Sequence, residues 1–299
     1  MSHVFQPYPS SQRAISDLLR LLSATVDVFH NSKVCGQWRI SEHKPPLTCF
    51  HLVTEGGCQL EMPGRLSTTM HAGDLILFPV ELPHSLTPIQ PLSGPQEHLP
   101  YPEAVNREGT GLLCASVSFR HPASELLLRA LPDVTLLTAS ETPWLQPLTS
   151  LILNESLTPR SASKVILEKL AELLFAYTLA NGYVANAMNQ NFLALYVHPR
   201  LGRAIDAIHE QPEFPWTLEL LARRAAQSRT AFAAAFKSIS GWTVMEYLCW
   251  WRMQLGWKLL HDGVRLSEVP AQVGYQSPAA FSRAFKRCFG INPGAVRRW

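Results

Sequence analysis

The sequence predicts an α+β protein whose N-terminal part is a β-barrel with flanking helices and whose C-terminal part is wholly helical. Residues 1–150 contain short strand-like runs separated by turn residues, a pattern typical of a barrel or a sandwich. After residue 197 no strand pattern remains, and apolar residues recur at helical spacing. The length of 299 residues agrees with two domains rather than one.

The charge of the chain is distributed unevenly. Residues 198–299 hold 14 Lys and Arg against 7 Asp and Glu, whereas residues 1–197 hold 12 against 16. A basic module joined to a mildly acidic one predicts that only the C-terminal part meets a polyanion such as double-stranded DNA. No apolar run approaches the ~20 residues of a membrane helix, and the first residues lack a signal-peptide pattern. We therefore expect a cytoplasmic protein without membrane contact.

The predicted strands follow one another closely in the N-terminal half. They are FHLVTEG (50–56), CQLEM (58–62), LSTTM (66–70), GDLILFP (73–79) and GLLCASVSF (111–119). Between the last two runs, residues 88–109 carry five prolines, and we expect an exposed loop there.

Helical patterns are predicted over residues 121–130 and 143–195. Within the second region, a run of apolar residues at helical spacing continues until Gly182, where we expect the helix to end. Two interpretations of this helix stay open. It covers the barrel or it forms a dimer interface, and both hold if its two faces differ.

Two similar patterns stand in the basic part of the chain, over residues 216–241 and 265–290. Each starts at a polar residue suited to cap a short helix, Thr217 in the first and Ser267 in the second. A turn and a second helix follow, and each second helix has two phenylalanines four residues apart and ends at a glycine. These residues are Phe232, Phe236 and Gly241 in the first pattern, and Phe281, Phe285 and Gly290 in the second. The repetition predicts two helix-turn-helix units.

A longer helix is predicted between the two units, over residues 243–263. Its apolar residues recur at helical spacing, so we expect it to join the units and hold them at a fixed separation. Gly256 lies within it and costs ~1 kcal/mol relative to alanine. Close packing against a neighbouring helix would explain this glycine.

The run from Arg252 through Gly274-Tyr275 to Gly290-Ile291-Asn292-Pro293 resembles the signature of the AraC/XylS family of transcription regulators. The resemblance covers the C-terminal third of the chain. It implies a domain of about seven helices with two recognition helices entering adjacent major grooves, and a homodimer that contacts RNA polymerase if it is an activator. Pro270 departs from the family pattern, but it falls in a first helical turn, where a missing N–H matters little.

The outward positions of the two second helices are the predicted DNA-binding residues. They are Arg229, Thr230, Ala233, Ala234 and Lys237 in the first unit, and Ser277, Ala279, Ala280, Ser282, Arg283, Lys286 and Arg287 in the second. Arg283 is the expected base-reading residue, because a guanidinium bridges the two acceptors of guanine. Lys286 and Arg287 are expected to meet phosphates. The alanines of the first unit predict that it reads fewer bases and relies on Arg229, Thr230 and DNA shape.

The segment GDLILFPVELPHSL (73–86) resembles the second motif of the cupin barrels, with Gly73, Pro79 and His84 at the motif's spacing. The first motif belongs at residues 48–57, where His51 is its single histidine, with Cys49 two residues earlier on the same strand face. The cupin metal triad is thus incomplete, which argues against dioxygenase chemistry and against an enzyme.

His51, His84 and Cys114 lie on three strand-like segments that a barrel can bring together, and imidazole and thiolate ligands suit zinc or copper. The chain is similar to a cupin subgroup of AraC-type regulators that carries this pattern. None of the six cysteines forms a CxxC pair, and buried thiols are the default interpretation. Two alternatives stay open: Cys35 and Cys114 form a redox pair, or the histidines are hydrogen-bonded residues near an organic ligand pocket.

These observations predict a cupin-like regulatory barrel over residues 1–150, a helical dimerisation or linker region over 151–196, and an AraC-type DNA-binding domain over 197–299. The predicted function is a sequence-specific DNA-binding transcriptional regulator. Its barrel senses an unknown effector, which is a small molecule, a metal or an oxidant. The alternative is a cupin-type metal-dependent enzyme with a DNA-binding tail.

Overall fold

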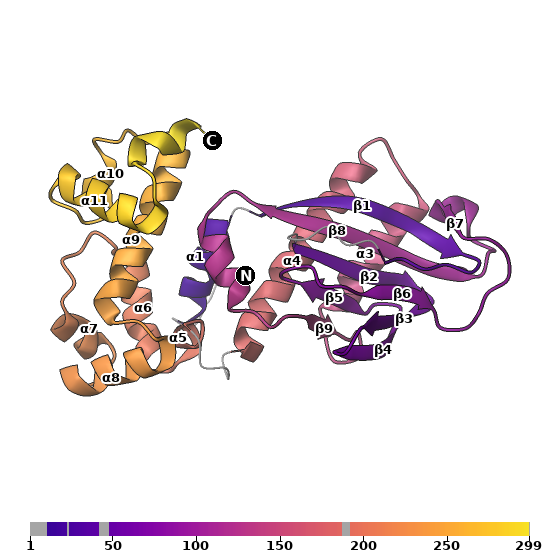
Figure 1. Ribbon diagram of the computed structural model, residues 1–299, viewed down its shortest axis with the longest axis horizontal. Helices are drawn as coiled ribbons and strands as arrows, with labels where there is room; N and C mark the ends of the chain where they lie inside the picture. Colours follow the sequence, from indigo (N-terminus) through magenta and orange to yellow (C-terminus); the bar gives the residue numbers. More distant parts are fainter. Residues whose placement is uncertain (1–10, 23, 42–47, 187–191, 299) are drawn as a thin grey trace, which may run out of the picture. The chain divides into compact units, whose positions relative to one another are not determined.

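A computed structural model describes residues 11–22, 24–41, 48–186 and 192–298 (Figure 1). The chain divides into two compact units. The unit that we call the barrel unit comprises Ala24–Ser118 and Leu131–Leu179, and the helical unit comprises Met1–Ser23, Phe119–Ala130 and Ala180–Trp299. This division differs from the expected boundaries, because two segments from the N-terminal half pack with the C-terminal helices.

The barrel unit is built from a six-stranded and a three-stranded sheet (Figure 1). The strand order is β7-β1-β8-β2-β5-β9 in the larger sheet and β4-β3-β6 in the smaller one. The strands are β1 (Ala24–Cys35), β2 (Thr48–Glu55), β3 (Gly57–Met62), β4 (Leu66–His71), β5 (Leu75–Phe78), β6 (Ser85–Pro88), β7 (Glu97–Leu99), β8 (Gly109–Phe119) and β9 (Thr135–Leu137). All five predicted runs are strands, whereas β1, β6, β7 and β9 lie outside them.

Strand β2 is buried on both faces, from Thr48 to Thr54. One face joins Cys49 and Val53 to the apolar core shared by the two sheets. Helix α3 (Leu145–Leu157) packs against β2 as well. A strand covered on both sides is a near-continuous apolar run, which is why its sequence does not alternate cleanly.

The proline-rich stretch 88–109 is not simply the exposed loop that we expected. It contains β7 and a short 3-10 helix, η1 (Tyr101–Glu103). The Tyr101 side chain is buried, and its hydroxyl is hydrogen-bonded to the Thr54 hydroxyl of β2. Burial of one aromatic ring with a satisfied hydroxyl anchors the stretch to the sheet.

Helix α4 (Ser163–Asn186) extends beyond Gly182, the residue at which we expected it to end. One of its faces is buried through Leu167, Ala171 and Leu174. Its other face leaves large apolar side chains in solvent, which is considered below. No helix in the described part of the chain is long and apolar enough to cross a membrane.

Helices make up the rest of the described chain. They are α1 (Ser11–Leu22), α2 (Ala123–Arg129), α5 (Ala194–Val197), α6 (Leu201–Glu210), α7 (Leu218–Arg224), α8 (Arg229–Ser240), α9 (Val244–His261), α10 (Val269–Gln272), α11 (Pro278–Phe289) and the 3-10 helix η2 (Pro293–Arg298). From α6 onward the described residues form six α-helices and one 3-10 helix, in agreement with about seven.

Both predicted helix-turn-helix units are present, as α7–α8 and α10–α11. The Thr217 side chain caps α7, and the serines Ser228 and Ser277 cap α8 and α11. The helices α8 and α11 end at Gly241 and Gly290 in the left-handed conformation, with φ of 75° and 73°. A glycine adopts this conformation without steric cost, which explains both C-terminal glycines.

The predicted cap Ser267 was wrong. Helix α10 starts at Val269, its N-cap residue is Glu268, and no side chain caps it. The amides of Glu268 and Val269 donate to the carbonyl of Arg265 at 2.9 and 3.3 Å, so a backbone turn satisfies them instead. Pro270 lies in the first turn of α10, as expected.

Helix α9 is the central helix of this unit and begins with a capping box between Thr243 and Glu246. Its N-terminal half buries Tyr247 against Phe236 of α8, with ring centroids 5.9 Å apart. Its C-terminal half contributes Met253 and Leu260 to the core around Phe281 and Phe285 of α11. Helix α9 thus supplies part of the hydrophobic core of both helix-turn-helix units.

Helix α1, which the sequence analysis missed, packs against α5, α6 and α9. The Asp17 carboxylate lies 3.8 Å from Nδ1 of His209, which is fully buried and stacked on Trp251 at 3.5 Å between ring centroids. Burial lowers the pKa of His209, while Asp17 opposes that shift. Asp17 and His209 therefore connect the start of the chain to the centre of α9.

We expect Gly256→Ala to destabilise the protein. An added Cβ would lie 2.9 Å from Cε2 of the buried Phe281 ring. Overpacking costs roughly 1–3 kcal/mol, against a gain of ~1 kcal/mol in helix propensity. We predict a net loss of about 1 kcal/mol in the free energy of unfolding, measured by urea denaturation. Gly294→Ala is the control, because nothing lies within 4 Å of the added atom; equal or higher stability of Gly256→Ala would contradict the packing argument.

Candidate DNA-binding surface and barrel interior

Helices α8 and α11 bury their phenylalanines and turn the predicted DNA-binding residues outward. The exposed residues are Arg229, Thr230, Ala234, Lys237, Ser277, Ala279, Arg283, Lys286 and Arg287, and the half-buried ones are Ala233, Ala280 and Ser282. Ser277 also accepts a hydrogen bond from the amide of Ala280 at 3.4 Å, so it is both a cap and a surface residue. Each helix therefore offers one continuous outer face.

The two outer faces differ in how their cations are held. Arg229 lies at the start of α8 and forms an ion pair with Glu219 of α7 at 2.9 Å. Among the described residues, Arg283 and Lys286 of α11 form no ion pair within the chain. Their charge is available to an external anion, whereas that of Arg229 is partly neutralised.

Arg252 of α9 bonds to the backbone of another segment and not to a carboxylate among the described residues. Its guanidinium donates to the carbonyls of Pro212 and Phe214 at 2.7 and 2.8 Å, and so it fixes the loop between α6 and α7. Gly274, with φ of 77°, lies against it, and a Cβ there would lie 2.7 Å from a guanidinium nitrogen. The glycine makes room for the arginine.

Sequence analysis did not single out Arg223 and Arg224, which lie exposed at the C-terminal end of α7. The guanidinium of Arg224 lies over the Trp216 ring at 5.7 Å. A signal for these residues was present in the sequence. The two arginines are adjacent and lie in the last turn of the helix that precedes a recognition helix.

His51 and His84 meet inside the barrel unit, with their Nε2 atoms 2.9 Å apart. Both side chains are buried. His51 lies on β2, and its register partner on β8 is Cys114. Of the three residues predicted as metal ligands, His51 is therefore hydrogen-bonded to His84 and lies opposite Cys114 on the neighbouring strand.

The hydrogen bonds assign the protons of the two imidazoles. His84 Nδ1 lies 2.7 Å from the carbonyl oxygen of Leu82, which can only accept, so this nitrogen is protonated and donates. In neutral His84 the Nε2 atom is then an acceptor, and the proton shared with His51 belongs to Nε2 of His51. A carbonyl that fixes the tautomer in this way is typical of a metal-binding histidine.

The thiols around this pair are buried and protonated. Burial raises the pKa of Cys49 to about 12 and that of Cys58 to about 12, with smaller contributions from Glu81 and Asp74 respectively. Burial also raises the pKa of Cys114, and the neighbouring Cys49 and Cys58 raise it further. Because the thiolate is the reactive form, these cysteines are unreactive in this state.

Cys35 is not brought to Cys114. A Cβ added to Gly109, the first residue of β8, would lie 2.9 Å from Cys35 Sγ, which places Cys35 at the start of that strand. Cys114 follows five residues later, roughly 16 Å along an extended strand. A disulfide needs Cα atoms within ~7 Å, so the two thiols cannot join without a rearrangement of the sheet.

The donor chemistry of His51, His84 and Cys114 suits zinc or copper. Among the described residues, however, no three His, Cys, Asp or Glu side chains are gathered as they would be around an ion. The metal site stays a prediction that requires side-chain movement.

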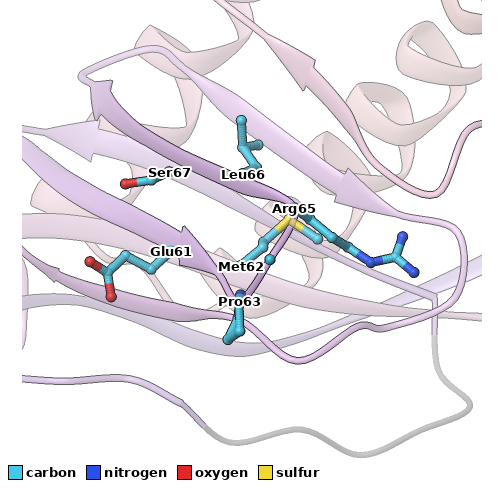
Figure 2. Close-up of a pocket in the computed structure, with 7 residues that line it drawn as sticks. Glu61, Met62, Pro63, Arg65, Leu66 and Ser67 are labelled. Atoms are coloured by element: carbon cyan, nitrogen blue, oxygen red, sulfur yellow. The ribbon is translucent and has the colours of Figure 1, made fainter.

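A hollow of about 460 Å³ lies at the β3–β4 turn, lined by consecutive residues from Glu61 to Ser67 (Figure 2). The side chains of Glu61 and Arg65 extend away from each other, and Arg65 pairs with Asp133. None of the predicted site residues lines this hollow, and one hairpin turn supplies all of its wall.

Two family models match the chain. Residues 13–181 match a family described as cupin, which covers more than half of the chain, and residues 221–298 match a family described as helix-turn-helix domain. The matched ranges contain the barrel residues His51, His84 and Cys114 and both recognition helices.

Relatives match the chain over nearly its whole length. An AraC-like transcription regulator of Streptomyces lividans is 31% identical over 95% of this chain and 97% of its own. RclR of Escherichia coli (strain K12), an RCS-specific HTH-type transcriptional activator, is 27% identical over 95% of this chain and 96% of its own. The crystal structure of ToxT from Vibrio cholerae with a bound unsaturated fatty acid covers 90% of this chain and 93% of its own, at 12% identity and a TM-score of 0.36.

Two exposed recognition helices with matching caps, a cupin barrel and full-length relatives all agree. The chain belongs to the AraC-like family of DNA-binding transcriptional regulators, with an N-terminal cupin domain.

Proposed function

We propose that the chain reads a specific promoter sequence mainly through α11, and that α8 contributes chiefly to position and shape. The observation that carries this proposal is Arg283, which is exposed in the middle of α11 and has no ion-pair partner in the described part of the chain. A guanidinium there can bridge two acceptors of a guanine. In α8 the outward positions between Thr230 and Lys237 are the small alanines Ala233 and Ala234, which offer only methyl contacts.

Arg283→Ala is expected to weaken binding to the preferred sequence by about 1–3 kcal/mol and to relax the base preference at one position. Lys286→Ala is expected to weaken binding to all sequences about equally and to lower the salt dependence by about one ion. The measurement is in vitro selection of DNA with the full chain, followed by fluorescence anisotropy at several salt concentrations.

Arg265→Ala is the matched control, since Arg265 is exposed in the same unit and forms an ion pair with Glu268 at 3.8 Å. An unchanged base preference in Arg283→Ala would remove this arginine from base reading. Loss of preference in Arg229→Ala that exceeds the loss in Arg283→Ala would reverse the assignment of the two helices.

We propose that the barrel unit is a sensor and not an enzyme, and that its effector acts on His51, His84 and Cys114. The protonated thiols and the hydrogen-bonded imidazoles support a resting state without an exposed nucleophile or base. Zinc or copper would be held by these three residues and would supply a cross-link between β2, β8 and the segment before β6. The protein then acts in the cytoplasm on promoter DNA, and it contacts RNA polymerase if it is an activator.

The metal prediction is tested on the full chain by native mass spectrometry and elemental analysis. We expect about one zinc or copper per chain after exposure to the ion, and loss of that ion in His51→Ala and in Cys114→Ser. Cys58→Ser is the control, because it removes an equally buried thiol from the same interior without removing a predicted ligand. Wild-type protein that binds no ion, or an ion retained by Cys114→Ser, would leave an organic effector as the interpretation.

We also propose that the protein is a homodimer that associates through the exposed face of α4. Val165 and Leu173 are 57% and 44% exposed on this face. Ion pairs of mixed sign flank them on the same helix, Lys164 with Glu168 and Lys169 with Glu172. A rim that carries both signs is complementary to a second copy of itself, which supports a symmetric contact.

The double variant Val165→Glu/Leu173→Glu is expected to be monomeric, because four carboxylates would meet in the apolar contact. Sedimentation equilibrium measures the mass. Val105→Glu is the control, an exposed valine of the same unit outside α4. A wild-type monomer, or a double variant that still dimerises, would contradict the proposed contact.

A further inference from the structure

A second hollow lies inside the helical unit, where the segment after β8 packs beside the C-terminal half of α9. Its volume is about 690 Å³, within the roughly 300–1,000 Å³ typical of ligand pockets. Its wall consists of Phe119, Arg120, His121, Pro122, Ser124, Glu125, Trp257 and His261. A smaller hollow of about 170 Å³ adjoins it and shares four of these residues. The larger hollow is lined by two segments that are far apart in the sequence, whereas a single hairpin turn lines the hollow between β3 and β4.

His121 lines this hollow with an imidazole ring that is held in place by two hydrogen bonds and is uncharged. Nε2 of His121 donates to the carbonyl of Gln254 on α9 at 3.0 Å, and Nδ1 accepts from the amide of Ala123 at 3.1 Å. Both nitrogens are therefore used. Burial lowers the pKa of His121 to about 4, despite the opposing hydrogen bond to Gln254. His121 offers a ligand its ring and no charge.

One cation of the wall is left without an anion. Lys258 and Asp262 beside the hollow form an ion pair with each other. Glu125 is paired with Arg129 at 2.6 Å. Among the described residues, Arg120 has no ion-pair partner, and its exposed side chain lines the hollow together with the aromatic rings of Phe119 and Trp257.

Trp257 connects the hollow to the second recognition helix. Its ring lies parallel to that of Phe285 on α11, with centroids 5.9 Å apart and planes 5° apart. It also contacts Phe289, with centroids 4.8 Å apart. A ligand group that contacts Trp257 therefore contacts a residue that packs against Phe285 and Phe289 of α11.

We propose that this hollow binds an aromatic carboxylate, whose ring lies against Trp257 and His121 and whose carboxylate pairs with Arg120. A guanidinium matches the two oxygens of a carboxylate in a forked pair. Aromatic walls favour a planar apolar body over a long flexible one, because ring faces stack or meet edge to face. Through Trp257, bound ligand shifts the position of α11 and so changes DNA affinity; this last step rests on the proposed function.

The test uses the full chain and two probes of equal shape, 2-naphthoate and the uncharged 2-naphthamide, in isothermal titration calorimetry. We expect 2-naphthoate to bind, and 2-naphthamide to bind at least about tenfold more weakly, as expected for loss of one charge-assisted contact. Arg120→Gln is expected to raise the dissociation constant of 2-naphthoate by a similar factor. Arg265→Gln, an exposed arginine elsewhere in the same unit, should leave it unchanged.

Absence of 2-naphthoate binding to the wild type would overturn the proposal. Equal affinity for the two probes, or unchanged affinity in Arg120→Gln, would overturn it too. DNA affinity of the same proteins is measured with and without 2-naphthoate. Sequence-specific DNA binding without the probe tests the regulator itself, so a failure of that function is distinguishable from a failure of this site.

Discussion

The helical unit depends on the sharing of one helix, α9, between two hydrophobic cores. Tyr247 near its start packs with Phe236 of α8, and Gly256 nearer its end lets the Phe281 ring of α11 approach. Because both helix-turn-helix units pack against side chains of the same rigid helix, they cannot rotate independently of each other. The separation of the two recognition helices is therefore set by packing along α9, and a flexible linker would leave it undetermined.

The chain passes between its two units several times, and this gives the barrel a direct covalent route to the DNA-binding helices. Strand β8 carries Cys114 opposite His51 and ends at Phe119. The next residues belong to the helical unit, where His121 donates to the backbone of α9. Helix α1, which precedes β1, packs against α9 as well. The segments that adjoin the barrel strands β1 and β8 thus contact the helix that both recognition helices share.

Much of the fold could be predicted from the sequence because local signals agreed with tertiary contacts. The repeated phenylalanine pairs and terminal glycines identified α8 and α11, and the glycine in α9 indicated close packing. Strand β1 was missed because the polar run His30, Asn31, Ser32 and Lys33 breaks the alternation of apolar and polar residues. Ser267 suited a cap, but the backbone turn closed by Arg265 satisfied the same amides.

The candidate sites were harder to predict than the fold. The sequence indicated that a barrel can bring the strands of His51 and Cys114 together, and the two residues are register partners on β2 and β8. It could not separate Cys35 from Cys114, because their distance depends on which end of β8 meets β1. The hollow around Arg120 depends on the contact between residues 119–125 and α9, and no local pattern encodes such a long-range contact.

The central claim is that α9 fixes the spacing of α8 and α11 on DNA. The most direct test is the affinity of the full chain for its selected DNA site after base pairs are inserted between the halves contacted by α8 and α11. Insertions of about five and about ten base pairs correspond to half a turn and one turn of the duplex. We predict that both insertions reduce the affinity at least about tenfold, to that of one half of the site alone. Unchanged affinity with either insertion would show that the two units move independently and would contradict the account.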